Sequence, residues 1–408
     1  MSPPTLPQEL LDMIFALLSD HRHSLAACSL VHRSWTFPAH RVLFQSLTVN
    51  MSGKTSDQIV QFISPDRARS AIPATSHVCH LTVKTGSLMF QDEVSVSTIA
   101  DMADSMPRLK TLAIIWATLS PPADVRRAPR RTLDCLTLCE VGSQVSAENV
   151  IKAFVARFNV RSFYVKAASF NNLTSPPAPS LDGYLACVQH FVVHSNSQTR
   201  SFFESFAKGP VRSLEIRLQP LEECADLLCS LATAGTVVER LLLDVSDCLP
   251  KITLGTLDDS RTFRHLRDCK GVTAATIRVQ YLVERWDRHA FNAVALRLIT
   301  LFLTSAPPTA QFLTVVLAVV PSAVPEPHAL LDAFANALAR HLDALRRNRP
   351  ALKMLRWVWD VVGAQTVQQK EASAEFEGLF QTVMAALCHT LCAKGIVKFG
   401  DEGSVASR

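Results

Sequence analysis

Apolar residues recur three and four positions apart near the start of the chain, which is the spacing of one face of an α-helix. The first such run consists of Leu10, Leu11, Ile14, Leu17 and Leu18. Pro7 and Glu9 stand just before it. Proline suits a first helical turn because its missing N–H would be unpaired there, and an acidic side chain is favoured by the helix dipole. The pattern therefore predicts a helix that begins near Pro7.

Two further short helices are expected before residue 45. The polar segment 19–23 ends the first helix, and the apolar run 25–31 predicts the second. Trp35 follows, and Pro38 predicts a break before the segment 41–44. A domain of roughly forty residues is marginally stable alone because it cannot bury all its apolar surface. We therefore expect these helices to leave part of that surface open for a partner.

Behind the helices, short segments of the form apolar-x-x-apolar-x-apolar recur. Such alternation favours β-strands, and between residues 78 and 238 the segments begin 23 to 31 residues apart. The matching positions are Phe44/Leu47/Val49, Val78/Leu81/Val83, Leu109/Leu112/Ile114, Leu133/Leu136/Leu138, Val160/Phe163/Val165, Val188/Phe191/Val193, Val211/Leu214/Ile216, Val238/Leu241/Leu243, Val272/Ala275/Ile277, Phe312/Val315/Leu317 and Leu352/Leu355/Trp357.

Sequence typical of helices or loops fills the intervals between these strands. Helices are expected at 147–158, 199–208, 221–233, 288–304, 327–347 and 374–392, and loops at 120–131 and 171–180. A strand followed by a helix or loop, repeated every 20 to 30 residues or so, resembles a leucine-rich-repeat solenoid. The asparagine that regular repeats carry after the third apolar position is mostly absent. The sequence thus predicts an α/β fold with an irregular leucine-rich-repeat-like β/α solenoid.

Composition narrows the possible functions. The 408 residues are 48% hydrophobic and 19% charged, with a net charge of +5 and a pI of about 8.7. This balance favours a folded core and is too mild to indicate nucleic-acid binding. The basic cluster at 126–131 is either a solvated loop or a patch for nuclear import or an acidic partner. No apolar run reaches the roughly 20 residues that a membrane-spanning helix needs.

Candidate chemistry is sparse. Eleven cysteines occur without a CxxC pair, which favours free, buried thiols and a cytoplasmic or nuclear protein. Cys388, His389 and Cys392 share part of a helix face, but no second ligand pair stands at zinc-like spacing, so we expect no metal. The phosphate-binding, dinucleotide-binding, hydrolase-elbow and metalloprotease motifs are absent, which predicts a non-catalytic protein without cofactors.

The N-terminal stretch resembles an F-box, the family pattern of which is Leu-Pro-x-Glu-Leu-Leu-x-x-Ile-Phe, an apolar run, Val-(Cys)-Arg-x-Trp and Leu-Phe. The chain carries Leu6, Pro7, Glu9, Leu10, Leu11, Ile14, Phe15, Leu18, Leu25, Cys28, Val31, Arg33, Trp35, Leu43 and Phe44 in register with it. His32 stands where many members have cysteine, and His23-Ser24 where an acidic residue is common. The layout is similar to the large F-box families of mushroom-forming fungi.

The resemblance implies a three-helix F-box that binds a Skp-type adaptor and, through it, a cullin-based ubiquitin ligase. The residues implied to bind the adaptor are Leu6, Pro7, Glu9, Leu10, Ile14, Leu18, Leu25, Cys28, Val31 and Trp35. Some of the apolar residues of this stretch, among them Leu11, Phe15, Leu17 and Trp35, are equally candidates for the helical core. The following domain would then select an unknown protein substrate.

Residues between the apolar strand positions should face away from the core by the two-residue period of a strand. The candidates for substrate contact on this face are Lys84, Tyr164, Lys166, His190, Val192, His194, Arg217, Arg240 and Leu242. An ordinary solvated sheet face is the alternative. Exposure of Val192 and Leu242 in this phase would favour an interaction surface.

These observations predict four segments: an F-box at 1–45, leucine-rich-repeat-like units at 46–250, longer-period units with a terminal cap at 251–402 and a tail at 403–408. The expected function is substrate recognition in an SCF-type E3 ubiquitin ligase. The alternatives are a non-degradative scaffold on the same fold and, more remotely, a hydrolase or transferase with an unrecognised site.

Overall fold

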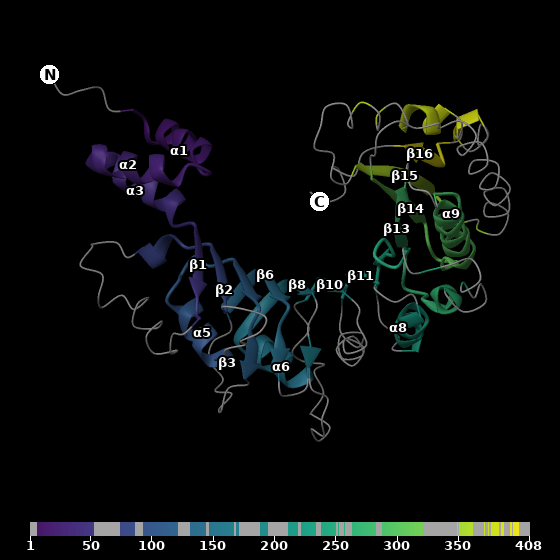
Figure 1. Ribbon diagram of the computed structural model, residues 1–408, viewed down its shortest axis with the longest axis horizontal. Helices are drawn as coiled ribbons and strands as arrows, with labels where there is room; N and C mark the ends of the chain where they lie inside the picture. The colour runs from purple at the N-terminus through teal and green to yellow at the C-terminus, as the bar shows by residue number, and fades with distance from the viewer. Residues whose placement is uncertain are drawn as a thin grey trace. The chain divides into compact units, whose positions relative to one another are not determined.

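The computed structural model is an α/β protein with parallel β-sheet and an N-terminal group of helices (Figure 1). It describes residues 6–52, 74–85, 93–120, 131–143, 147–166, 169–170, 188–194, 211–218, 222–233, 238–249, 252, 257, 263–282, 288–320, 349, 351–361, 371, 374, 377–382, 385–386, 392–393 and 395–399. The chain divides into two compact units, Met1–Val188 and Gln189–Arg408. The boundaries predicted at residues 45 and 250 stay predictions.

The described residues before Ser46 form three helices, as expected. They are α1 (Gln8–Leu17), α2 (Arg22–Val31) and α3 (Arg33–Leu43). Pro7 occupies the N-cap position of α1, and its carbonyl accepts hydrogen bonds from the backbone of Leu10 and Leu11. His32 separates α2 from α3, where its Nδ1 accepts a hydrogen bond from the Ser34 backbone at 3.2 Å. That bond satisfies one of the free N–H groups at the start of α3.

The break predicted at Pro38 is wrong, because α3 continues through this residue to Leu43. Proline lacks the N–H that would bond the carbonyl four residues earlier and normally disfavours a helix interior. Pro38 and Ala39 are, however, buried against the rest of the helical group. Tertiary packing thus overrides the local preference for a break.

The first unit contains two parallel sheets. The main sheet has the order β1 (Ser46–Asn50), β2 (His80–Lys84), β4 (Thr111–Ile115), β6 (Arg131–Cys139) and β8 (Phe158–Lys166). The second sheet has the order β3 (Glu93–Ser95), β5 (Thr118–Ser120), β7 (Gly142–Ser143) and β9 (Ser169–Phe170). The connections include the 3-10 helix η2 (Ala74–His77) and helices α5 (Val96–Asp104) and α6 (Ala147–Arg157).

The second unit is built on parallel strands in the order β10 (His190–His194), β11 (Ser213–Arg217), β12 (Arg240–Asp244), β13 (Ala274–Leu282), β14 (Phe312–Val320), β15 (Met354–Val361) and β16 (Val397–Phe399). Helices α8 (Glu222–Thr233) and α9 (Arg288–Ser305) and the 3-10 helix η4 (Arg264–Asp268) connect them. In Figure 1, α9 lies beside β13 and β14.

The apolar strand positions predicted from the sequence pair with one another across neighbouring strands. Leu81 pairs with Leu112, and Leu112 pairs with Leu136. Leu214 likewise pairs with Leu241, and all of these side chains are buried. A parallel pairing that keeps every apolar position on one face is what a sheet with one buried face requires. The predicted strands and their register are therefore confirmed at these positions.

The first position of one predicted triplet is wrong. Phe312 is 40% exposed, whereas its neighbour Leu313 is fully buried and pairs with Ala275 and Leu355. Val315 and Leu317 are buried as predicted, and the triplet in register with Val272/Ala275/Ile277 is Ala310/Leu313/Val315. Because β14 is apolar on both faces, with Val316 and Ala318 also buried, alternation does not show where the triplet begins.

Three of the predicted helices lie almost entirely within the described residues and can be compared with the structure. Those expected at 147–158, 221–233 and 288–304 are confirmed as α6, α8 and α9. The helices expected at 199–208 and 327–347 and the loop at 171–180 lie outside the described residues. So does the loop at 120–131 apart from its two ends, Ser120 in β5 and Arg131 in β6. Helical turns are described at several positions of the expected closing helix, including 377–382.

Candidate functional site

Helix α1 presents an apolar stripe to solvent. Leu6, just before the helix, is 45% exposed, Leu10 is 45% exposed and Ile14 is 43% exposed. Met13 and Leu17 extend the same stripe and are more exposed still. The spacing of three and four residues places these side chains on one side of the helix. The opposite side carries Leu11 and Phe15, which are buried.

The core of the helical group is small. Its fully buried members are Leu11, Phe15, Leu25 and Ala39, with Leu18, Cys28, Trp35, Val42 and Leu43 packed half-buried around them. Phe15 and Trp35 meet edge to face, with ring centroids 6.0 Å apart. Four fully buried residues are few for three helices, and the remaining apolar side chains stay at the surface.

The implied adaptor-binding residues separate into three groups by exposure. Leu6, Pro7, Glu9, Leu10, Ile14 and Val31 are exposed, and Leu18, Cys28 and Trp35 are half-buried. Leu25 is fully buried in the core of the helical group, and its contact with a partner stays a prediction. Leu17, by contrast, is 82% exposed and does not belong to the core for which it was a candidate.

Sequence reasoning missed further exposed apolar residues of the helical group as candidates for docking. They are Met13, Leu30 and Phe37, of which Leu30 is 88% exposed. Met13 lies three residues after Leu10 and four before Leu17, so the helical period alone places it on the stripe. Leu30 and Phe37 carry no such signal, because which of their faces is open depends on how α2 and α3 pack.

On the sheet, the candidate substrate residues occupy the predicted face but do not form one uniform surface. Tyr164, Lys166 and Arg240 are exposed, whereas Lys84, His190, His194, Arg217 and Leu242 are half-buried. Val192 is only 7% exposed, so the expectation that it is open to solvent is wrong. His190 and His194 flank it on the same side of β10 and are half-buried.

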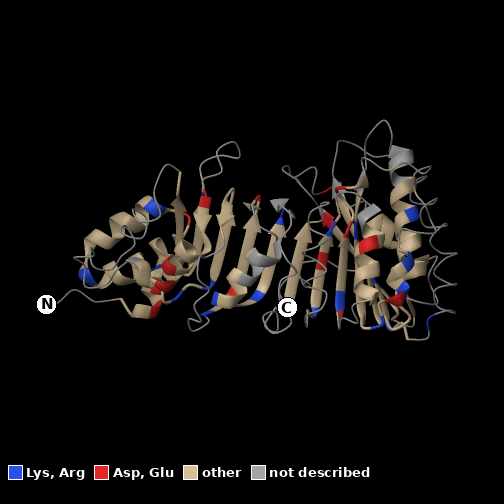
Figure 2. Ribbon diagram, turned by 90° about the horizontal axis from the view of Figure 1, so that it is seen from below, with Lys and Arg blue, Asp and Glu red and all other residues tan. Residues whose placement is uncertain are grey.

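Arg217 belongs to a chain of ion pairs that crosses the second unit. Its Nε donates to Glu215 Oε1 at 2.7 Å and lies 4.0 Å from Asp244 Oδ2. Asp244 also faces Arg278, which in turn pairs with Asp360. Figure 2 shows charged positions of both signs on the strands. Burial lowers the pKa of Arg217, but the bond to Glu215 and the surrounding carboxylates raise it more, so the guanidinium stays charged.

The ends of β4 and β6 in the first unit share an uncommon turn. Trp116 and Glu140 follow these strands at equivalent positions, and each has a positive φ, at 58° and 53°. Trp116 Nε1 donates to Glu140 Oε2 at 2.8 Å, and Lys84 lies over the indole ring at 5.8 Å. A left-handed conformation costs non-glycine residues about 1 kcal/mol or more, and these side-chain contacts offset part of that cost.

The nine cysteines that the structure describes are free, as expected, but fewer of them are deeply buried than predicted. Of the cysteines that the structure describes, Cys224, Cys248 and Cys269 are buried and the others are half-buried. Burial raises the pKa of the Cys269 thiol to about 12, which keeps it protonated. The described residues contain no metal-binding cluster, and Cys388 and His389 lie outside them.

In comparisons with known proteins, no family model and no curated protein matches this chain. Within the described residues, the helices are all too short or too polar to cross a membrane.

Proposed function

We propose that this protein is the substrate-recognition subunit of an SCF-type E3 ubiquitin ligase. The observation that carries the proposal is the stripe on α1, formed by Leu6, Leu10, Met13, Ile14 and Leu17, within a stretch that resembles an F-box. Three of these residues, Leu6, Leu10 and Ile14, are positions through which the resemblance implies adaptor contact.

Exposure of this kind favours a partner on energetic grounds. Burying a leucine or isoleucine side chain contributes about 1.5–3 kcal/mol relative to leaving it in water. Large apolar side chains grouped on one helix face are typical of interaction sites rather than of ordinary surface. An apolar helix face that docks into a groove is a recurring mode of recognition. A Skp-type adaptor is the occupant that the sequence pattern indicates.

For the remainder of the chain we propose an irregular leucine-rich-repeat-like β/α array that binds the substrate. Two observations support this. In each unit, successive strands of the main sheet are parallel neighbours in chain order. The equivalent left-handed residues Trp116 and Glu140 indicate that two successive turns repeat the same backbone geometry. The exposed part of the candidate face, which includes Tyr164 and Arg240, is the proposed contact region.

The first test is binding of the purified full chain to a Skp-type adaptor. The variant Leu10→Ala/Ile14→Ala removes exposed apolar side chains and should leave the unfolding free energy within about 0.5 kcal/mol of wild type per site. We expect it to weaken adaptor binding at least tenfold. Phe312→Ala, which removes an equally exposed apolar side chain from the second unit, is the matched control and should bind normally.

Adaptor binding that is absent in the folded wild-type chain, or equal in the two variants, would contradict the proposal. A second measurement separates a ligase subunit from a scaffold on the same fold. Reconstituted with adaptor, cullin and ubiquitin-loaded enzyme, the ligase subunit should promote ubiquitination of a protein bound to the repeats. A scaffold would bind the adaptor without that effect.

A further inference from the structure

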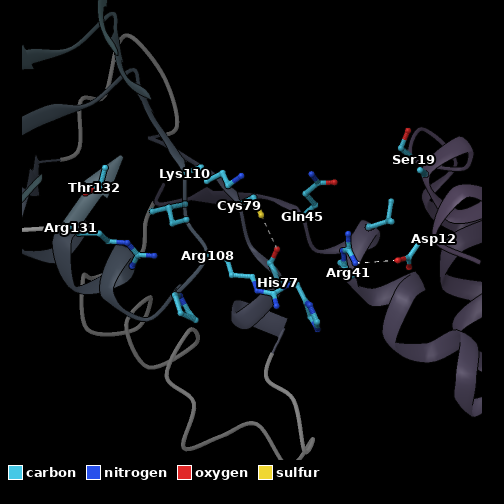
Figure 3. Close-up of a pocket in the computed structure, with 14 residues that line it drawn as sticks. Asp12, Ser19, Arg41, Gln45, His77, Cys79, Arg108, Lys110, Arg131 and Thr132 are labelled. Atoms are coloured by element: carbon cyan, nitrogen blue, oxygen red, sulfur yellow. Dashed lines mark hydrogen bonds and ion pairs between the residues drawn. The ribbon is translucent and has the colours of Figure 1, made fainter. Parts of the chain in front are cut away.

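A cavity of about 810 Å³ lies within the first unit, between helices α1 and α3 and the segments that lead into β2, β4 and β6. Figure 3 shows Arg41 and Asp12 on the helical side and Lys110 and Arg131 on the strand side, with Arg108 and His77 between them. This volume lies in the range of small-molecule binding sites, which is about 300–1,000 Å³.

The charges on the cavity wall are strongly unequal. Four permanent cations line it, Arg41, Arg108, Lys110 and Arg131, against one carboxylate, Asp12. Asp12 pairs with Arg41 at 3.4 Å, but both side chains are largely open to solvent, so this pair holds Arg41 weakly. Arg108 and Lys110 form no ion pair with any residue in the described part of the chain. The cavity therefore retains a surplus of positive charge.

Arg131 is held in place before any ligand arrives. Its guanidinium donates to the backbone carbonyls of Ala103 and Met106 at the end of α5. Burial lowers its pKa, while nearby Asp104 favours the charged form. Lys110 is fixed through its backbone, which donates to Cys79 O and accepts from Asp134 N, both at 2.8 Å. Preorganised cations bind an anion with less loss of conformational entropy than free surface side chains do.

His77 supplies an independent observation. The residue is 4% exposed, and its Nδ1 is buried without a hydrogen-bond partner among the described residues. Its ring meets Phe37 edge to face at 5.1 Å, which fixes the imidazole at the cavity wall. An unpaired buried polar atom is destabilising, and such atoms in native proteins usually have a partner. His77 lines the cavity, so a turn of its ring would bring this atom to a ligand oxygen there.

We propose that this cavity binds a small soluble ligand that carries at least two phosphate groups. More than one phosphate is needed because four cations and one carboxylate leave a net charge of +3 on the wall. Arginine guanidinium groups match the oxygens of a phosphate or a carboxylate with paired hydrogen bonds, and phosphate is favoured because each group carries more negative charge. The inference does not depend on adaptor binding, since the cavity and the α1 stripe are formed by different side chains.

Such a ligand would contact α3 through Arg41 and the strand segments through Arg108 and Lys110 at the same time. Bound there, it would stabilise the packing of the helical group on the first strands. A ligand that binds only the folded form raises stability in proportion to the logarithm of its concentration. Binding should therefore be visible both as heat and as a rise in melting temperature.

The test is isothermal titration of the full chain with inorganic tripolyphosphate at low ionic strength. We expect saturable binding that Arg108→Gln/Lys110→Gln weakens at least tenfold. Both side chains are exposed, so the variant should fold. The matched control, Arg161→Gln/Arg212→Gln, removes two exposed cations outside the cavity and should bind as wild type does. Sodium sulfate added at the same concentration as tripolyphosphate, with the ionic strength of the buffer held constant, should not displace the bound tripolyphosphate.

Three outcomes would overturn the proposal. The first is no saturable binding by the folded wild-type chain at millimolar tripolyphosphate. The second is an equal loss in the two double variants, which would indicate diffuse attraction to a basic protein. The third is full displacement by sulfate, which would indicate an unselective anion site. Failure of adaptor binding would leave all three readouts unchanged, so the two proposals are tested separately.

Discussion

The helical group α1–α3 and the strands of the second unit solve the same physical problem in opposite ways. In the helical group, four residues are fully buried while large apolar side chains such as Leu17 and Leu30 face solvent. In the second unit, strand after strand buries its apolar positions, and charged residues pair with one another on the other face. The helical group leaves apolar side chains in water, whereas the strands of the second unit bury their apolar side chains and pair their charged ones. The difference indicates where a partner adds most stability.

The largest effect on stability is expected from replacing Phe15 in the core of the helical group. Phe15→Ala deletes a fully buried ring and its contact with Trp35, which should cost about 3–5 kcal/mol. In so small a core that loss should unfold α1–α3 while the second unit stays folded. Amide hydrogen exchange should show fast exchange in α1–α3 and unchanged protection in β13–β15.

Phe302→Ala in α9 is the matched substitution in the second unit, since Phe302 is equally buried. It should raise exchange around α9 and β13 and leave α1–α3 unchanged. If either variant raised exchange uniformly along the chain, the two regions would not be independently stable.

A second substitution tests how much the ion pairs on the strands contribute to the stability of the second unit. Asp244 faces both Arg217 and Arg278, and it accepts a hydrogen bond from the Ser246 backbone at 3.1 Å. Asp244→Ala should lower the unfolding free energy by about 1–3 kcal/mol, because Arg217 and Arg278 each lose one of two carboxylate partners and the Ser246 N–H loses its acceptor. Urea unfolding measures the change. Asp247→Ala, at an exposed neighbour, should stay within about 0.5 kcal/mol, and a loss as large as that of Asp244→Ala would argue against the network.

The smallest expected effect is a pH dependence at the contact between helices and strands. Burial lowers the pKa of His77 below its ordinary 6.5, and the positive charges of Arg108, His40 and Arg41 lower it further. As pH falls below about 6.5, the unfolded chain therefore takes up a proton that the folded chain does not, and stability is lost until the pH reaches the folded-state pKa.

His77→Asn removes this contribution. Urea midpoints measured between about pH 7 and pH 5 should fall less in the variant than in wild type. Parallel curves would show that the imidazole does not titrate differently in the two states. Saturating tripolyphosphate should also reduce the slope in wild type, because an anion beside the ring favours its charged form.

How well the sequence predicts each part depends on how local the determining interactions are. The strands and their pairing follow from alternation, as at Leu81 and Leu112, because a shift of one residue would expose every core side chain. Alternation is less informative where a strand is apolar on both faces, as in β14, where Val315 and Leu317 are buried as predicted but Phe312 is exposed. Pro38 and Val192 were misplaced for a related reason: packing by neighbouring elements decided their environment.

The candidate surfaces, too, can be predicted only where their residues lie close together in the sequence. The α1 stripe could be predicted in part: Leu10, Ile14 and Leu17 recur at the helical period, but Met13 was missed and Leu17 was also a candidate for the core. The cationic cavity could not, because Arg41, His77, Arg108 and Arg131 come from four segments that only the folded chain brings together. The basic cluster at 126–131 was the one signal in the sequence, and its last residue, Arg131, does line the cavity.

The order of the strands bears on how such a chain can change over generations. In the main sheet of each unit, a strand pairs with the strands before and after it in the chain, so no pairing depends on a distant partner. Gain or loss of one strand with its connection would leave the other pairings formed. Such a scaffold tolerates duplication and deletion while the N-terminal helices stay constant. Length and binding face could then diverge between descendants that dock in the same way.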